Sequence, residues 1–222
     1  MAAANIEIVT IVSEFFEENC YLVYATEQTT NPPRCVLVDP GADGEAIVAA
    51  VEKRGLVPEQ ILITHGHADH FISLEGLLDH WKDVELSYSV GEKDAGKMTS
   101  ATRNLSAVVG VPFSCRATKN HLREGDTVEA GGVKMKVLEI PGHSEGHVAF
   151  VVQDIKPLVV LVGDVIFDGS IGRTDFPGGN FDLLLEGIRT KLFTLPDTTR
   201  LLTGHGKETT VGKEKSTNPY FA

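Results

Sequence analysis

The chain has 222 residues, 42% hydrophobic and 23% charged, which is ordinary for a folded domain and unlike a disordered protein. Its formal net charge of −11 argues against nucleic acid as a partner, because phosphate binding needs clustered Lys and Arg. No apolar run approaches the roughly 20 residues that cross a bilayer, and the N-terminus lacks the positive region of a signal peptide. We therefore expect a cytoplasmic protein without membrane contact, with one domain over residues 1–222.

The three cysteines, Cys20, Cys35 and Cys115, are scattered and form no C-x-x-C pair. An odd number of cysteines without a secretion signal predicts reduced thiols, which usually behave as small buried apolar residues.

The first half of the chain alternates short β-rich runs with turns. Residues 7–12, 20–24 and 35–38 predict strands, and the third run stops at the breaker cluster Asp39-Pro40-Gly41. Helical spacing of apolar residues at positions 46–51 predicts a helix that ends near Gly55. A buried strand over residues 61–63 then runs directly into a histidine-rich segment, and leucines at positions 74–78 indicate a helix.

The second half has the same plan. Residues 133–140, 148–152 and 158–162 predict strands, residues 184–192 a helix and residues 200–202 a last short strand. Residues 91–120 give no clear pattern. Strands interleaved with single helices predict an α/β sandwich with its sheets inside and its helices outside.

The segment Thr64–His70 places four side chains that can bind metal within six positions: His65, His67, Asp69 and His70. His65 and His67, two apart in an extended chain, can point toward one ion. Asp69 and His70 follow where a helix would begin and can turn toward an adjacent ion. Imidazole and carboxylate suit zinc, iron or manganese.

Three further patches follow predicted strands. His143 lies in a turn flanked by glycine, whereas His147 starts the next strand and is interpreted as a packed or supporting histidine. Asp164 ends a run of five apolar residues, where a buried carboxylate needs a compensating partner, so it is a candidate bridge between metal ions. His205 lies between two glycines after the last strand. His80 and His121 receive no role.

Together these residues resemble the metallo-β-lactamase superfamily in the order H-x-H-x-D-H, His, Asp, His. Within it, the stretches Gly163–Phe167 and Gly169–Gly179 are similar to the short glyoxalase II-like branch, the hydroxyacylglutathione hydrolases. The resemblance covers nearly the whole chain and implies a four-layer αββα sandwich. Only 17 residues follow His205, too few for the helical domain with which full-length glyoxalase II contacts glutathione, which leaves the substrate open.

The resemblance also implies the grouping of the ligands. His65, His67 and His143 would hold a first metal ion, and Asp69, His70 and His205 a second, with Asp164 bridging both. Zinc is expected first, with iron or manganese as alternatives. Asp69 is also a candidate for orienting the attacking water, although a ligand role is preferred.

The implied reaction is hydrolysis of a small-molecule thioester, such as S-lactoylglutathione, by hydroxide that two adjacent cations generate from water. Arg173 has two interpretations: an ion pair with Asp175 that orders the loop, or a contact with a substrate carboxylate, for which its planar fork is suited. Lys207 is a weaker candidate for such a contact. The sequence does not fix the oligomeric state.

Three other functions stay open. A persulfide dioxygenase of the same superfamily would use one Fe(II) held by His65, His143 and Asp164. A lactonase or other ester hydrolase would use the same pair of metal ions. A metal-binding scaffold without activity is disfavoured because no ligand position is missing.

Overall fold

Two six-stranded sheets face each other in the computed structural model, which describes residues 5–14 and 16–221. In order across the first sheet lie β1 (Ile6–Val12), β2 (Asn19–Ala25), β3 (Arg34–Val38), β4 (Val57–Ile63), β5 (Ser87–Gly91) and β6 (His121–Leu122). Across the second lie β14 (Thr209–Thr210), β13 (Arg200–Thr203), β10 (Val159–Gly163), β9 (Val148–Val152), β8 (Val133–Glu139) and β7 (Thr127–Ala130). A separate ribbon pairs β11 (Ile166–Phe167) with β12 (Ser170–Ile171).

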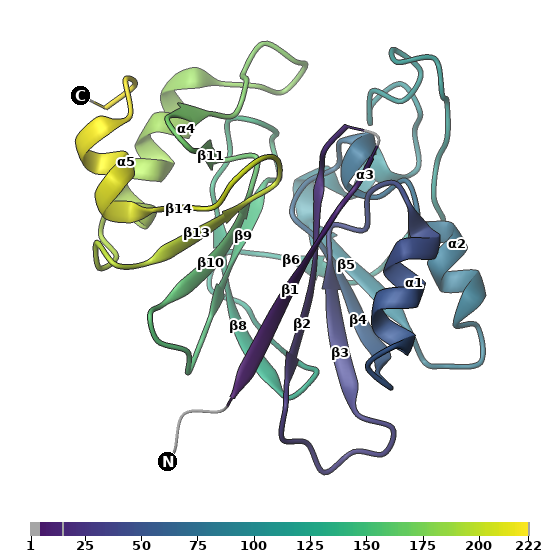
Figure 1. The fold of residues 1–222 in the computed structure, drawn as a ribbon. Coiled ribbons are helices and arrows are strands. Elements are labelled where there is room, and N and C mark those ends of the chain that lie inside the picture. The colour runs from purple at the N-terminus through teal and green to yellow at the C-terminus, as the bar shows by residue number, and fades with distance from the viewer. Residues whose placement is uncertain (1–4, 15, 222) are drawn as a thin grey trace.

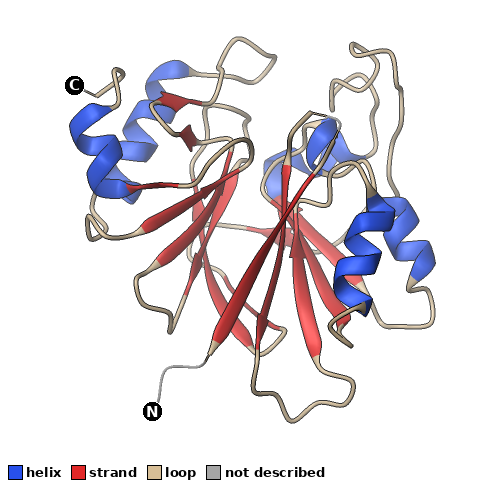
Figure 2. Ribbon diagram, viewed as in Figure 1, coloured by secondary structure: helices blue, strands red, loops and turns tan. Residues whose placement is uncertain are grey.

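Helices cover the outer face of each sheet. Helices α1 (Gly44–Glu52) and α2 (Leu74–His80) lie on the first sheet, and α4 (Phe181–Gly187) and α5 (Val211–Thr217) lie on the second (Figure 1). Figure 2 shows the resulting order of helix, sheet, sheet and helix. The predicted four-layer αββα sandwich is therefore confirmed.

Three apolar cores fill the spaces between these four layers. Leu37 packs with Ile47 and Leu74 between the first sheet and its helices. Val36, the neighbour of Leu37 on β3, packs with Phe150 between the two sheets, because successive side chains of a strand point to opposite faces. A third core lies between the second sheet and α4. The continuous apolar runs of the sequence thus belong to strands buried on both faces.

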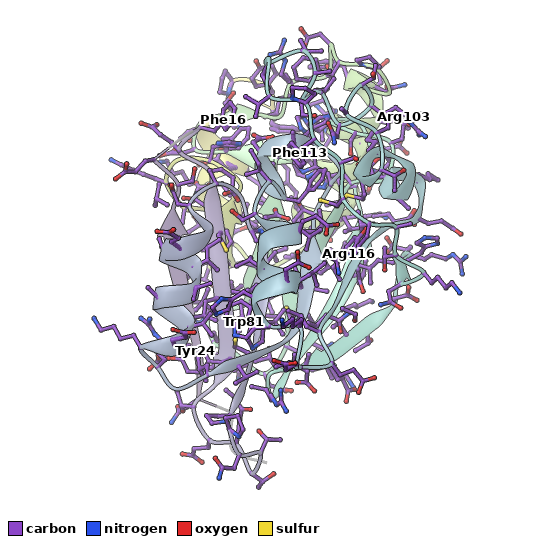
Figure 3. All side chains as sticks on the ribbon, turned by 90° about the vertical axis from the view of Figure 1, so that its right-hand side faces the viewer. Phe16, Tyr24, Trp81, Arg103, Phe113 and Arg116 are labelled. Carbon is purple, nitrogen blue, oxygen red and sulfur yellow. The ribbon has the colours of Figure 1, made fainter. Side chains whose placement is uncertain are left out.

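Several elements were not predicted. The short strands β5, β6 and β7 and the C-terminal helix α5 carry weak apolar patterns and are recognised only in the structure. Residues 91–120, which showed no clear sequence pattern, contain the 3-10 turn η2 (Glu92–Asp94) and the short helix α3 (Ala95–Met98), followed by a long loop. Viewed from the side of α1 and α2 in Figure 3, Phe113 of this loop lies in the upper half of the molecule, above Trp81. The ring of Phe113 contacts that of Phe71, with centroids 5.3 Å apart.

Strand direction places the site. β4 runs parallel to β3 and β5 in the first sheet. In the second sheet β10 runs parallel to β13, and β8 points the same way because both β8 and β10 are antiparallel to β9. The turns after β4, β8, β10 and β13 meet at one edge of the sandwich, at the top of Figure 1. These are the four turns that carry the predicted ligands.

Two further features bear on the sequence predictions. All three cysteines are free and buried, as predicted. Within the described residues, no helix is both long enough and apolar enough to span a membrane.

Candidate metal centre

The structure brings all seven predicted ligands into one cluster. His65, His67 and His143 form one group of potential ligand atoms, and Asp69, His70 and His205 form a second, with the atoms of each group within 4.8 Å of one another. We call these groups the inner trio and the outer trio. They come from both sheets, since the turn after β4 supplies four members and the turns after β8 and β13 supply one each.

The inner trio is a tight set of buried imidazoles. His143 Nε2 lies 2.9 Å from His67 Nδ1 and 3.2 Å from His65 Nε2. Burial lowers the pKa of His67 to about 3, with a further contribution from the adjacent His143. Burial and the neighbouring imidazoles also hold the pKa of His65 well below its usual value. The three rings are therefore neutral, which is the form that binds a metal ion.

The outer trio is more open to solvent. His205 Nε2 lies 3.2 Å from Asp69 Oδ2, and His70 Nε2 lies 3.8 Å from the same oxygen. The Asp69 and His205 side chains keep 24% and 27% of their surface exposed. Burial opposes protonation of His205, but its hydrogen bond with Asp69 raises the pKa above the ordinary value. Asp69 and His205 thus lie at the surface of the site, whereas His70, the third member, is fully buried.

Asp164 lies between the two trios. Its Oδ1 is 3.4 Å from His70 Nε2, and its Oδ2 is 3.6 Å from His143 Nε2 and 3.7 Å from His205 Nε2. Burial alone would raise its pKa, but the nearby His70 holds that pKa below its usual range. A Cβ added at Gly204 would lie 2.1 Å from Asp164 Oδ1, so this position requires glycine. The carboxylate is placed to serve both trios.

The cluster fits divalent metal ions. A tetrahedral ion with bonds of 2.0–2.1 Å separates its ligand atoms by about 3.3 Å, close to the separations of 2.9–3.8 Å found here. Within the described part of the chain, Asp164 Oδ1 and His70 Nε2 are buried without a hydrogen bond of good geometry. Buried polar atoms of this kind are costly unless they bind something. A cation between them removes that cost.

Further contacts orient several rings. His143 Nδ1 donates to the Arg173 carbonyl at 2.8 Å, and His205 Nδ1 donates to the Phe16 carbonyl at 3.0 Å. His70 Nδ1 lies 3.1 Å from Asp39 Oδ2, so its Nε2 faces the site. Such contacts fix the tautomer and orientation of a ligand.

Two buried acids behind His70 were missed from the sequence. Asp39 accepts hydrogen bonds from the Thr64 amide at 2.7 Å and the Thr64 hydroxyl at 2.6 Å. Its position at the end of an apolar strand was a usable signal. Glu18 is fully buried next to them, and burial raises the pKa of its carboxyl well above the usual value. Nothing in the local sequence around Glu18 indicated this burial.

The remaining three histidines lie outside both trios. His147 is buried, stacks on His65 with ring centroids 4.8 Å apart and accepts a hydrogen bond of 3.1 Å from the Asp164 amide. It therefore supports the turn that carries Asp164. His80 pairs with Glu52 on the surface at 3.1 Å, and His121 lies exposed on β6.

The two basic candidates differ in position. Arg173 lines the cavity beside the cluster, and its guanidinium donates to both oxygens of Asp175, at 2.7 and 2.8 Å. The same group lies 3.8 Å above the ring of Phe176. The first interpretation of Arg173, an ion pair that orders its loop, is thus present in the structure. Lys207 is exposed and does not line this cavity.

The cavity itself has a volume of about 470 Å³ and opens directly onto both trios. Most of its other wall residues are apolar, including Phe16, Leu105, Val109, Phe167 and Phe176. Leu105 and Val109 come from the loop after α3, so residues 91–120 contribute one wall of the cavity. A small molecule fits beside the cluster, partly shielded from water.

Comparison with known proteins agrees with this geometry. The family model of the metallo-beta-lactamase superfamily matches residues 14–205. The hydroxyacylglutathione hydrolase GloC of Haemophilus influenzae is 34% identical over 219 residues, which cover 98% of this chain and 98% of GloC.

Two solved structures share the fold over nearly their whole length. The BLEG-1 B3 metallo-beta-lactamase gives a TM-score of 0.87 at 30% identity, covering 97% of this chain and 100% of that one. TTHA1623 in a di-iron-bound form gives a TM-score of 0.80 at 33% identity, covering 96% and 99%.

Proposed function

Because the chain belongs to the metallo-β-lactamase superfamily, we propose that it is a metal-dependent thioester hydrolase of the glyoxalase II-like kind. It would cleave S-acyl derivatives of a small thiol, with S-lactoylglutathione as the first candidate substrate. The observation that carries this proposal is the placement of the Asp164 carboxylate between two trios of potential ligands, beside a cavity that takes a small molecule. The 34% identity to GloC over nearly the full length of both chains supports the thioester class.

The proposed metal site consists of the inner trio, the outer trio and Asp164. Zinc is the first candidate because histidine and carboxylate ligands suit it, and iron is the second. The di-iron-bound relative supports the inclusion of iron. Bound divalent ions lower the pKa of water toward about 7 and polarise a carbonyl, which supplies a nucleophile and an electrophile at neutral pH.

The protein's own residues orient the reaction. The apolar walls from Leu105, Val109 and Phe176 shield the reacting carbonyl from bulk water, which strengthens electrostatic interactions at the site. The Asp69 carboxylate faces the cluster from the solvent side, where it orients the attacking water in addition to its proposed ligand role. Hydrolysis adds water across the acyl C–S bond: the oxygen ends in a carboxylate, one proton of the water is taken up by the departing thiolate, and the other is released to solvent.

The leaving group suits this set of residues. A thiol has a pKa of about 8.5, so it departs as thiolate without a strong general acid. An alkoxide from an ordinary ester needs more help with protonation. The thioester is therefore preferred over the lactone or ester alternative.

Elemental analysis paired with a hydrolysis assay tests the proposal. The purified protein should contain about two metal ions per chain, as expected for two adjacent sites, and should hydrolyse S-lactoylglutathione. One iron per chain, together with oxygen consumption on glutathione persulfide, would establish the dioxygenase instead. Metal binding without turnover of thioesters, esters or lactones would leave only the scaffold.

A further inference from the structure

A further buried acid, Asp94, lies behind the inner trio and belongs to no ligand group among the described residues. Asp94 is the last residue of the 3-10 turn η2 and is 0% exposed. No role for Asp94 was predicted from the sequence. A buried carboxylate of this kind is stable only where donors surround it.

Four donors surround Asp94. Its Oδ2 accepts from the Gly66 amide at 2.8 Å and the Ser144 hydroxyl at 2.6 Å. Its Oδ1 accepts from the Gly146 amide at 2.9 Å and from Lys97 Nζ at 2.7 Å. Hydrogen bonds to an ionised acceptor are about twice as strong as neutral ones.

These donors belong to the two turns that build the inner trio. Gly66 lies between His65 and His67 in the turn after β4 of the first sheet. Ser144 and Gly146 follow His143 in the turn after β8 of the second sheet. One carboxylate therefore joins ligand-bearing turns from opposite sheets.

The packing around Asp94 leaves these turns little freedom. A Cβ added at Gly66 would lie 2.6 Å from Lys97 Cβ, and one added at Gly146 would lie 2.4 Å from the Asp94 amide nitrogen. Lys97 is itself buried, and its ammonium balances the carboxylate charge. The backbone of η2 and α3 thus packs directly on both turns.

We propose that Asp94 is a positioning residue of the metal centre, whose carboxylate sets the separation between the turn of His65 and His67 and the turn of His143. Asp94 itself is not a metal ligand in this proposal, because each of its carboxylate oxygens already accepts two hydrogen bonds from the protein. The inference rests on the proposed metal-dependent function. The donors of Asp94 directly flank inner-trio ligands, so its effect should be largest at the inner trio, although Asp69 and His70 share the turn of Gly66.

The test uses Asp94→Asn in the full-length, zinc-loaded protein. The amide keeps the side chain's shape but turns an NH₂ group toward one pair of donors. We expect zinc affinity, measured by competition with a chelator, to fall about 10- to 100-fold, as when supporting contacts of metal ligands are removed. We expect most of the loss at about one of two bound ions, because the donors of Asp94 directly flank inner-trio ligands. The d–d spectrum of the cobalt-substituted protein should change as well.

A double variant separates positioning from simple stability. Asp94→Asn leaves the Lys97 ammonium buried without its partner, which destabilises the fold. Adding Lys97→Met removes that charge and should restore the melting temperature, while zinc affinity stays low. If the double variant recovers both properties, Asp94 is only structural and the inference fails.

Two further variants complete the test. Ser144→Ala removes one donor with little risk to folding and should give a smaller loss of zinc affinity in the same direction. Glu92→Gln, in the same turn, changes an exposed side chain paired with Arg123 and should change nothing. Unchanged zinc affinity in both Asp94→Asn and Ser144→Ala would overturn the inference about Asp94 but not the proposed function. If the unmodified protein bound no metal, the proposed function itself would be overturned.

Discussion

The inner trio is buried, with His65, His67 and His143 at 0%, 5% and 3% exposed, whereas Asp69 and His205 of the outer trio keep about a quarter of their surface in solvent. The surroundings differ in the same sense. The turns of the inner trio are joined by Asp94, which accepts from the Gly66 and Gly146 amides and from the Ser144 hydroxyl. In the outer trio, the His205 ring contacts the Phe16 carbonyl and the Asp69 carboxylate, whereas His70 is fixed by a buried partner, Asp39.

This contrast indicates that the two halves of one site are built for different tasks. Buried, neutral imidazoles in fixed turns favour retention of an ion. A half-exposed carboxylate and imidazole beside the cavity favour exchange with solvent and substrate. Asp164 faces both halves and is the residue that we propose to bridge them.

The largest effect on activity is expected at Asp164, the residue that faces both trios. Asp164→Asn removes a carboxylate shared by both trios and should lower kcat/KM by more than about 100-fold, beyond the effect of changing supporting residues. Metal content after dialysis should fall for both ions. Asp168→Asn, four residues later on the surface, is the matched control. Retained hydrolysis in Asp164→Asn would contradict the bridging role.

Paired histidine variants test the two halves separately. His67→Gln should cost the protein about one metal ion even at high zinc, because a buried ligand has no replacement from water. His205→Gln lies at the solvent side, where water can take the vacant position, so added zinc should restore both ions. Metal titration followed by elemental analysis distinguishes them, with His80→Gln as the control. Equal losses in both variants would show that exposure does not decide retention.

Metal removal should show two phases. A chelator added to the loaded protein should take the ion of the outer trio several-fold faster than that of the inner trio, because solvent reaches it directly. Activity should fall with the first phase, since both ions serve the reaction. A single phase of metal release would mean that the trios lose their ions together.

The smallest effect is expected at the ion pair on the rim of the cavity. Arg173 and Asp175 are both more than half exposed, and such pairs contribute little. Arg173→Met should leave metal content unchanged and alter kcat/KM by less than about threefold. A much larger rise in KM for glutathione thioesters than for uncharged thioesters would instead support a contact with a substrate carboxylate, the second interpretation of this residue.

Much of the ligand set was predictable because histidine and aspartate residues directly follow apolar runs in the sequence. The strand at 61–63 and the run at 158–162 are apolar throughout, so the polar residues that follow them had to lie at a sheet edge. Strands interleaved with single helices predicted a sandwich with its helices outside, and the family resemblance implied the four αββα layers. The ion pair of Arg173 was one of two predicted alternatives.

By itself, the sequence determined which side chains can bind metal and that they follow buried strands. Only the tertiary structure decided how the inner trio is held, because Asp94 accepts from backbone amides. Every non-proline residue carries such an amide, so the sequence does not show which amides need a partner. The burial of Glu18 and the apolar wall from Leu105 and Val109 likewise depend on packing between segments far apart in the chain. Local pattern identifies the ligands, whereas long-range packing sets their separation.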